Sequence, residues 1–253
     1  MKEKNSQGGR KMKLKYVCMS NIGKLRRTNQ DNFVVPNHEC ADTLHDTTEM
    51  IFGEAEDNGA ALAVFDGIGG LAKGEVASSL AAKSMKDFTK KKCMRKEDYN
   101  DLCLLMNEKI CQYMKLHKIS SMGTTFSSLL FRDREVTVCN IGDSPIFYVN
   151  SGSMKKLSLD HTGFGGSVKP GLTQYLGIPT EEFVIEPFIN SSKLQVGDRY
   201  LICSDGITDM VSRIDIMDIL NEKNIERAAS KLTDAALENG GRDNLTLILI
   251  DVN

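Results

Sequence analysis

An apolar pentapeptide that runs straight into an acidic, glycine-rich turn constrains this chain more than any other feature. Residues 61–65 (ALAVF) are typical of a buried strand, and Asp66 ends it, with three glycines among the next four residues. A carboxylate in that position lies at the rim of a sheet, where backbone carbonyls can also approach a bound cation. Taken alone, the stretch is equally typical of an ordinary β-turn that contains an aspartate.

Three further aspartates follow the same design. Asp143 and Asp205 each end a predicted apolar strand, and Asp243 directly precedes the last one. Strand ends gather at the rim of a sheet, so we expect these carboxylates and Asp66 to face one another. Oxygen ligands of this kind favour Mg²⁺ or Mn²⁺, and two such ions can hold an acidified water in line with a phosphorus atom.

Cysteine and histidine offer little alternative chemistry. The seven cysteines form no CxxC pair and the four histidines are scattered, so the usual kind of zinc site is not indicated. Cys203, beside Ser204 and Asp205, is a conceivable thiol nucleophile. Most of the cysteines, however, lie in apolar runs, where a reduced thiol packs as a small hydrophobe. We therefore expect any metal to be held by oxygen atoms.

Two adjacent arginines, Arg26 and Arg27, precede Asp31 in a polar loop that leads into a short strand. A guanidinium can grip two phosphate oxygens at once, which suits a site where phosphate and metal meet. A solvated loop is the competing interpretation of such a pair. The arginine pair and the acidic turns together make hydrolysis of a phosphoester the natural chemistry.

Length and composition describe one ordinary globular domain. The chain has 253 residues, 41% hydrophobic and 26% charged, and a net charge of -2, which points to neither nucleic acid nor membrane as a partner. Residues 1–12 look like a disordered basic tail without the apolar segment of a signal peptide, and residues 13–253 form the predicted domain. No apolar run approaches the length of a membrane span, so we expect a cytoplasmic protein.

The hydrophobic pattern predicts an α+β fold. Helical periodicity begins at Gly74, recurs over residues 99–114, and returns near Ile225, whereas most of the remaining apolar runs are typical of strands. This order favours two mainly antiparallel sheets packed face to face, with helices outside. Residues 36–60 look like a surface excursion, and residues 160–171 are too rich in glycine to be regular.

One further strand is expected from Phe183 to Ile189, and a short helix with a capping pattern should begin at Ser212. The glycine-rich stretch of residues 163–167 should be mobile and leave the site open to varied protein surfaces.

Several of these features recur together in one known family. The motifs stand in this order: Arg26-x-x-Asn29-Gln30-Asp31, residues 64–70 (VFDGIGG), Gly123-Thr124-Thr125, residues 140–144 (NIGDS), residues 172–177 (LTQYLG), residues 203–206 (CSDG) and residues 241–244 (GRDN). In this order they resemble the metal-dependent serine/threonine protein phosphatases (PPM, or type 2C), especially the compact bacterial members. The resemblance runs from about Leu14 to the C-terminus, and seven motifs in order are far more specific than any one.

The resemblance implies a fold and an activity. The fold is a four-layer α-β-β-α sandwich with a binuclear Mn²⁺ or Mg²⁺ centre between the sheets. The activity is the hydrolysis of phosphoserine and phosphothreonine on proteins by a metal-bridging hydroxide, with no covalent intermediate. Its partners would be phosphorylated proteins and an opposing serine/threonine kinase in a signalling system.

The resemblance also implies roles for particular residues. The implied metal ligands are Asp31, Asp66, the Gly67 carbonyl, Asp143, Asp205 and Asp243. Asp66 bridges two ions, Asp31 or Gln30 serves the second directly or through water, and Asp143 with Asp205 binds a possible third. Arg26 binds the substrate phosphate.

Two departures from the family pattern bear on function. Position 68 is Ile where animal members carry a His proposed as general acid, so the leaving oxygen is expected to take its proton from metal-bound water. The segment between His161 and Leu172 is much shorter than the flap of bacterial relatives. Two other functions stay open: a catalytically dead member that binds or senses, and a hydrolase of small phosphoesters, although no phosphate-binding glycine loop supports a nucleotide substrate.

Overall fold

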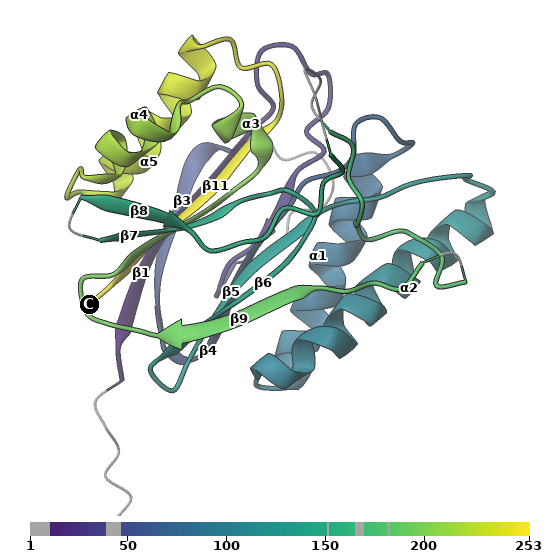
Figure 1. The fold of residues 1–253 in the computed structure, drawn as a ribbon, viewed down its shortest axis with the longest axis horizontal. Helices are drawn as coiled ribbons and strands as arrows, with labels where there is room; N and C mark the ends of the chain where they lie inside the picture. Colours follow the sequence, from purple (N-terminus) through teal and green to yellow (C-terminus); the bar gives the residue numbers. More distant parts are fainter. Residues whose placement is uncertain (1–10, 39–46, 151, 165–169, 182) are drawn as a thin grey trace, which may run out of the picture.

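Two antiparallel sheets pack face to face between two layers of helices (Figure 1). The computed structural model describes residues 11–38, 47–150, 152–164, 170–181 and 183–253. This is the α-β-β-α sandwich expected from the sequence, and the helices cover the outer faces of both sheets.

The first sheet has six strands in the order β3-β1-β11-β10-β7-β8. Their bounds are β1 Lys13–Asn21, β3 Thr47–Glu56, β7 Ile146–Asn150, β8 Ser153–Lys156, β10 Arg199–Cys203 and β11 Leu245–Val252. The second sheet has five strands in the order β2-β4-β5-β6-β9. Their bounds are β2 Asn32–Val34, β4 Asn58–Phe65, β5 Phe126–Arg132, β6 Glu135–Ile141 and β9 Phe188–Lys193. Neighbouring strands run antiparallel, as in β1 against β11 and β4 against β5.

The helices form two separate groups. Helices α1 (Gly74–Lys91) and α2 (Tyr99–His117), joined by a 3₁₀ turn at Lys96–Asp98, cover the second sheet. Helices α3 (Asp205–Thr208), α4 (Arg213–Leu220) and α5 (Ile225–Glu238) cover the first. Ser212 caps α4 as expected, since its hydroxyl accepts the Asp215 N–H at 3.2 Å.

Strand β4 shows how the apolar run of residues 61–65 is used. Leu62 and Val64 point into the layer between the two sheets, whereas Ala63 and Phe65 point toward α1 and α2. Both faces of the strand are therefore dry, which explains why the run is continuously apolar rather than alternating. The first polar side chain after this apolar run is that of Asp66, directly after the strand ends.

The expected excursion over residues 36–60 is corrected by the structure, because most of its second half is strand β3 at the edge of the first sheet. Ile51 and Ala55 pack against the core between the two sheets, while Phe52 and Glu54 are exposed. The alternation is present in the sequence, but glutamates and a glycine weaken its apolar signal.

The strand expected at Phe183 to Ile189 is wrong in its bounds. Strand β9 instead runs from Phe188 to Lys193 and pairs with β6. Pro187 has no N–H for a ladder, and Phe183 and Val184 before it are exposed. An edge strand needs few apolar residues, so its polar second half gave no periodic signal.

Met12, placed at the end of the expected tail, belongs to the fold, because it is 5% exposed and its N–H donates to Asp57 Oδ1 at 2.9 Å. Residues 1–10 and most of the glycine-rich stretch of residues 163–167 lie outside the described residues. Phe164 is described and is fully exposed.

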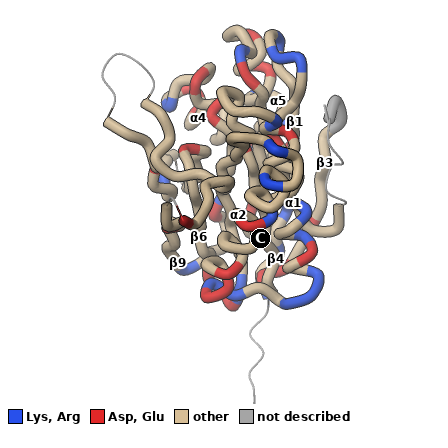
Figure 2. Tube along the Cα trace, turned by 90° about the vertical axis from the view of Figure 1, so that its right-hand side faces the viewer, with Lys and Arg blue, Asp and Glu red and all other residues tan. Residues whose placement is uncertain are grey.

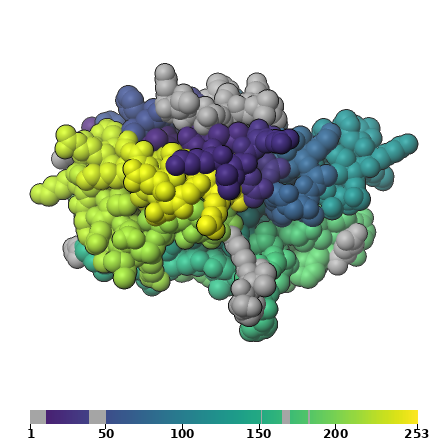
Figure 3. Space-filling view, turned by 90° about the horizontal axis from the view of Figure 1, so that it is seen from above, coloured from purple at the N-terminus to yellow at the C-terminus, as the bar shows by residue number. Residues whose placement is uncertain are grey.

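The surface carries both signs of charge. Acidic and basic residues are interspersed in Figure 2, in keeping with the small net charge. Figure 3 shows the N-terminal segments (purple) lying against the C-terminal ones (yellow), as the pairing of β1 with β11 requires. In the part of the chain that is described, no helix combines the length and the apolar character that crossing a membrane requires.

Candidate metal centre

Five aspartates stand at strand ends that meet at one rim of the sandwich, and we call them the acid cluster. They are Asp31, Asp66, Asp143, Asp205 and Asp243. The four others each lie close enough to Asp66 to raise the pKa of its carboxyl by electrostatic repulsion. The structure thus brings together every carboxylate that the sequence pointed to.

Three hydrogen bonds with two neighbouring threonines hold the main chain of Asp66. Its N–H donates to Thr125 Oγ1 at 3.0 Å, and its carbonyl accepts the Thr125 N–H at 2.8 Å and the Thr124 hydroxyl at 2.9 Å. Thr124 and Thr125 immediately precede β5, the neighbour of β4. The two threonines therefore fix the direction in which the Asp66 side chain leaves the strand.

Burial and mutual repulsion raise the pKa of two carboxylates in the acid cluster. The pKa of Asp66 is raised well above its usual value, first by burial and then by the charges of Asp205, Asp31, Asp143 and Asp243. The pKa of Asp31 is raised to about 7, mainly by burial, and hydrogen bonds from Thr246 and Ser204 offset this only in part. Such carboxylates repel one another unless a cation or a proton lies between them.

Asp31 also has an unsatisfied atom. Its Oδ2 accepts the Ser204 hydroxyl at 2.8 Å, whereas its buried Oδ1 has no hydrogen-bond partner among the described residues. A buried carboxylate oxygen without a partner is costly, and such atoms in native proteins need an explanation. A bound cation is the explanation that fits a carboxylate on which the charges of Asp205 and Asp243 also act.

Arg26 extends over the same rim. Its Nη2 donates to Asp243 Oδ2 at 2.6 Å, and both side chains are more than a third exposed. This hydrogen bond raises the pKa of Arg26, and the charges of Asp66 and Asp205 add to it. Arg27 is also exposed, but among the described residues it makes no hydrogen bond or ion pair to the acid cluster.

Asn244 is a residue whose role the sequence did not reveal. Its Oδ1 accepts the Gln30 N–H at 2.8 Å, and its Nδ2 donates to the carbonyls of Ile22 at 2.9 Å and Thr28 at 3.1 Å. It thereby ties the loop that carries Arg26 to the start of β11. Its position beside Asp243 was the available signal, since an amide can serve donors and acceptors together.

Gly67 lies where only a glycine fits. A Cβ there would come within 2.5 Å of the Gly74 carbonyl oxygen and 2.6 Å of the Gln30 carbonyl oxygen. Its N–H donates to that same Gln30 oxygen at 3.1 Å. Close packing of three backbone segments thus forms the floor beside Asp66.

The chemistry of the acid cluster suits hard cations. Every charged candidate ligand is a carboxylate, and the nearby Cys203 is buried, which raises the pKa of its thiol and disfavours the thiolate. Within the described ranges, no three acidic, histidine or cysteine side chains already enclose a common point. The residues present nevertheless fit Mg²⁺ or Mn²⁺ as a set of oxygen donors.

The fold and the acid cluster together define a class: an α-β-β-α sandwich with an oxygen-lined site at the rim of its sheets. Within that class, the chain belongs to the protein phosphatase 2C family, whose profile matches residues 37–249. The match covers most of the described domain and includes four of the five clustered aspartates, so it bears out the resemblance in the motifs.

Two individual relatives are serine/threonine phosphatases. The serine/threonine protein phosphatase PstP of Mycobacterium tuberculosis is 29% identical over 210 residues, which are 76% of this chain and 40% of PstP. The serine/threonine phosphatase stp of Listeria welshimeri is 28% identical over 232 residues, which are 79% of this chain and 87% of the relative. This chain therefore spans about two fifths of the length of PstP and most of the length of stp.

Solved structures share the fold. The catalytic domain of PstP in complex with two manganese ions superposes with a TM-score of 0.77 at 26% identity, covering 95% of this chain and 99% of that one. The serine/threonine phosphatase of S. agalactiae gives a TM-score of 0.78 at 23% identity, over 95% of this chain and all of the other. These likenesses agree with the two sheets and their flanking helices.

Proposed function

We propose that this chain is a Mn²⁺- or Mg²⁺-dependent phosphatase that removes phosphate from phosphoserine and phosphothreonine in proteins. The observation that carries the proposal is the acid cluster, with a buried Asp31 oxygen that lacks a partner beside the exposed guanidinium of Arg26. Carboxylates that repel one another fit a pair of cations, and a guanidinium at their edge fits a phosphate. Membership of the protein phosphatase 2C family supports the same chemistry.

Each proposed ligand has a distinct task. Asp66, the Gly67 carbonyl and Asp31 would hold one cation, and Asp66, Asp205 and Asp243 the other, with Asp143 and Asp205 available to a third. When bound, the cations supply an acidified water as nucleophile and offset the charge of the phosphoryl group. The PstP catalytic domain, described in complex with two manganese ions, supports a count of two.

Arg26 would orient the substrate. Its guanidinium already lies at the edge of the acid cluster, where one N–H group is engaged by Asp243. The remaining N–H groups can donate to two phosphate oxygens, which would turn the phosphorus toward the water. The ion pair with Asp243 keeps the side chain at the site before the substrate arrives.

A covalent intermediate is not needed in this proposal. Ser204 is buried and donates its hydroxyl to Asp31, and burial raises the pKa of the Cys203 thiol. Neither group is a good nucleophile in such surroundings. The Ile68 side chain has no acidic proton to donate, so the leaving oxygen would be protonated by water rather than by this side chain.

The test is an assay with two substrates and two metal conditions. The protein should hydrolyse p-nitrophenyl phosphate and a phosphothreonine peptide with Mn²⁺ and lose both activities in EDTA. A higher kcat/KM on the peptide would support a protein substrate, whereas a preference for small phosphoesters would favour the other hydrolase. Failure on both substrates, together with Mn²⁺ binding by calorimetry, would point to the dead member instead.

The partners remain part of the proposal. A protein phosphatase implies phosphorylated protein substrates and an opposing serine/threonine kinase, which a comparison of phosphoproteomes with and without the protein would identify. The cytoplasmic location expected from the sequence is likewise a prediction, and cell fractionation would test it.

A further inference from the structure

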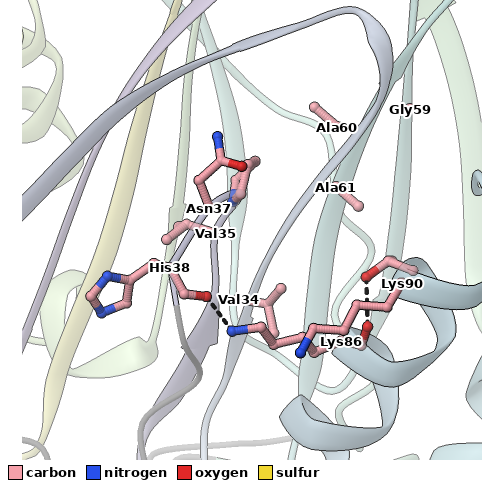
Figure 4. Close-up of a pocket in the computed structure, with 11 residues that line it drawn as sticks. Val34, Val35, Asn37, His38, Gly59, Ala60, Ala61, Lys86 and Lys90 are labelled. Atoms are coloured by element: carbon pink, nitrogen blue, oxygen red, sulfur yellow. Dashed lines mark hydrogen bonds between the residues drawn. The ribbon is translucent and has the colours of Figure 1, made fainter.

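One histidine ring forms a hydrogen bond beside the acid cluster. In the described part of the chain, His38 accepts the Lys86 ammonium through its main-chain carbonyl (Figure 4). The His117 ring packs against that of Tyr113, with 4.1 Å between the ring centroids. The ring of His161 instead accepts a main-chain N–H next to a proposed metal ligand. His161 is therefore the histidine best placed to act on the acid cluster.

Two hydrogen bonds join His161 to Gly142, the residue before Asp143. The Gly142 N–H donates to His161 Nδ1 at 3.1 Å, and the His161 N–H donates to the Gly142 carbonyl at 3.0 Å. A ring nitrogen can accept a hydrogen bond only when it carries no proton. Burial lowers the pKa of the His161 ring, which favours this neutral form, although the charge of Asp160 acts in the opposite direction.

Thr125 and Ser127 hold the same turn from the other side. The hydroxyls of Thr125 and Ser144 share a hydrogen bond at 2.7 Å, and the Ser127 hydroxyl donates to the Ser144 carbonyl at 2.5 Å. Gly142 has a φ of +100°, and a Cβ there would come within 2.7 Å of the Thr125 side chain. Because Gly142 and Ser144 flank Asp143, their contacts fix the direction in which its carboxylate leaves the turn.

The segment that carries His161 is itself anchored. Asn140 Nδ2 donates to the Leu159 carbonyl at 2.6 Å, and Asn140 Oδ1 accepts the Leu159 N–H at 3.1 Å. After this pair, the His161 carbonyl accepts the Thr173 N–H at 2.8 Å. The ring thus reaches Gly142 from a main chain that has its own hydrogen bonds. Removing the ring acceptor should therefore disturb the turn more than the path of the segment.

Asp143 belongs to the acid cluster electrostatically, since its charge helps to raise the pKa of Asp66. Under the proposed function, Asp143 would bind a cation together with Asp205. A metal ligand depends on the groups that orient it, and changing such a group typically weakens metal binding by about 10–100-fold. The hydrogen bond from Gly142 to the His161 ring is a contact of this orienting kind.

We propose that His161 is a positioning residue for Asp143: its ring accepts the Gly142 N–H and so fixes the carboxylate that would bind a cation with Asp205. The inference rests on the proposed function for the presence of that cation. His161 itself would supply no ligand atom. The metal centre would then depend on a side chain outside the acid cluster.

Mn²⁺ binding by the full chain tests the proposal without turnover. The electron paramagnetic resonance signal of free aqueous Mn²⁺ gives the number of bound ions and their dissociation constants, and Asp143→Ala identifies the binding step that depends on Asp143. His161→Leu removes the acceptor at similar side-chain size and should weaken that same step at least about tenfold. His161→Asn should stay within about twofold of wild type, because its amide oxygen can take the place of Nδ1.

His161→Gln is the matched control. It carries the same amide one methylene farther from the main chain, where the amide corresponds to Nε2 rather than Nδ1, so it should bind Mn²⁺ as weakly as His161→Leu does. In the Asp143→Ala background, His161→Leu should add no further loss of affinity, because the histidine acts through that aspartate. Thermal unfolding in EDTA checks that each variant folds. If His161→Leu does not fold, the contrast between His161→Asn and His161→Gln decides.

Equal Mn²⁺ affinity in wild type and His161→Leu would overturn the proposal, and so would equal losses in His161→Asn and His161→Gln. A further loss in the double variant would show that His161 acts elsewhere, and unchanged binding in Asp143→Ala would show that Asp143 holds no cation. Either result also overturns it. A wild type that shows the expected binding differences but hydrolyses no phosphoester would remove the proposed function and leave the role of His161 standing. A wild type that binds no Mn²⁺ would remove both.

Discussion

Two carboxylate sites in this molecule, each with one buried aspartate, are treated in opposite ways. Asp198, in the turn before β10, accepts hydrogen bonds on both oxygens, from Tyr148 and Asn150 on one and from the Gln195 N–H and Tyr200 on the other. Asp31, in the acid cluster, has one satisfied oxygen and one without a partner, and faces further carboxylates. The two side chains are similarly buried, but hydrogen bonds satisfy both oxygens of Asp198, whereas Asp31 keeps an unpaired oxygen and is repelled by its neighbours.

The difference teaches which carboxylates serve the fold and which serve a ligand. A satisfied buried carboxylate stabilises a turn, because its neighbours would otherwise be left without partners. A set of repelling carboxylates destabilises the metal-free chain, and it is retained in native proteins where function requires it. Substitutions in the two places should therefore separate activity from stability.

The largest effect is expected from Asp66→Ala and Asp205→Ala. Each removes a carboxylate that would neutralise the cations, so kcat with Mn²⁺ should fall at least about a thousandfold, equivalent to roughly 4 kcal/mol. Thermal unfolding in EDTA should show no loss of stability, because repulsion within the cluster is reduced. Activity within a few-fold of wild type in either variant would show that the metal assignment is wrong.

The opposite pattern is expected from Asp198→Ala. It leaves two tyrosine hydroxyls, an amide and a main-chain N–H without their acceptor, at a cost of about 3 kcal/mol. Chemical denaturation should show this loss, while kcat/KM of the folded fraction stays near the wild-type value. A large loss of kcat/KM at temperatures where the variant is folded would break the distinction between the two sites.

Arg26 and Arg27 sharpen the comparison at the rim of the acid cluster. Arg26→Ala should raise KM for phosphorylated substrates, with a loss of about 1.5–3 kcal/mol in transition-state binding, because a charge-assisted contact to phosphate is removed. Arg27→Ala is the matched control and should have little effect, since Arg27 is also exposed and makes no hydrogen bond or ion pair with the cluster among the described residues. If Arg27→Ala caused the larger loss, the phosphate ligand would be the other arginine.

The sequence predicted the layers of this fold because its strongest elements are periodic. Helices α1, α2 and α5 and the buried strands carry unmistakable apolar patterns, and the packing of two sheets between helices follows from their order. Strand β3 and the bounds of β9 escaped prediction because edge strands are stabilised mainly by main-chain ladders. Glutamate, serine and glycine are tolerated there, so little side-chain periodicity remains.

The acid cluster was predictable only in part, for a related reason. Asp66 directly follows the apolar strand β4 and Asp205 stands two residues after the end of β10, and these positions mark both carboxylates in the sequence. Ser204 and Thr125 also adjoin strands, but small hydroxyl residues do not by themselves indicate a metal site, and their partners are distant, as in the hydrogen bond from Ser204 to Asp31, 173 residues away. Groups that position a site by long-range hydrogen bonds become visible only when the strands are placed side by side.

The smallest effect, and the most direct test of the contrast, concerns pH. The pKa of Asp31 is raised from an ordinary 3.8 to about 7, so the folded chain binds this proton more tightly than the unfolded chain does. Without metal, the contribution of this group to stability is therefore fully present below its unfolded pKa and is lost as the pH rises through about 7.

Asp31→Asn removes that titration, so the variant should be more stable than wild type in EDTA near pH 8, by on the order of 1 kcal/mol or a few degrees in Tm. Near pH 4 the two should differ little, and Mn²⁺ near pH 8 should reverse the ranking, because only the wild type keeps the complete ligand set.

Asp57→Asn is the matched control: Asp57 is buried, but both of its oxygens accept main-chain N–H groups, from Met12 and Arg134. An amide nitrogen there would face a donor, so that variant should lose stability in EDTA. Calorimetric unfolding of the wild type and both variants is the measurement. If Asp31→Asn were less stable than wild type in EDTA near pH 8, the unpaired Asp31 oxygen would not destabilise the metal-free chain, and a cation would have no such destabilisation to remove.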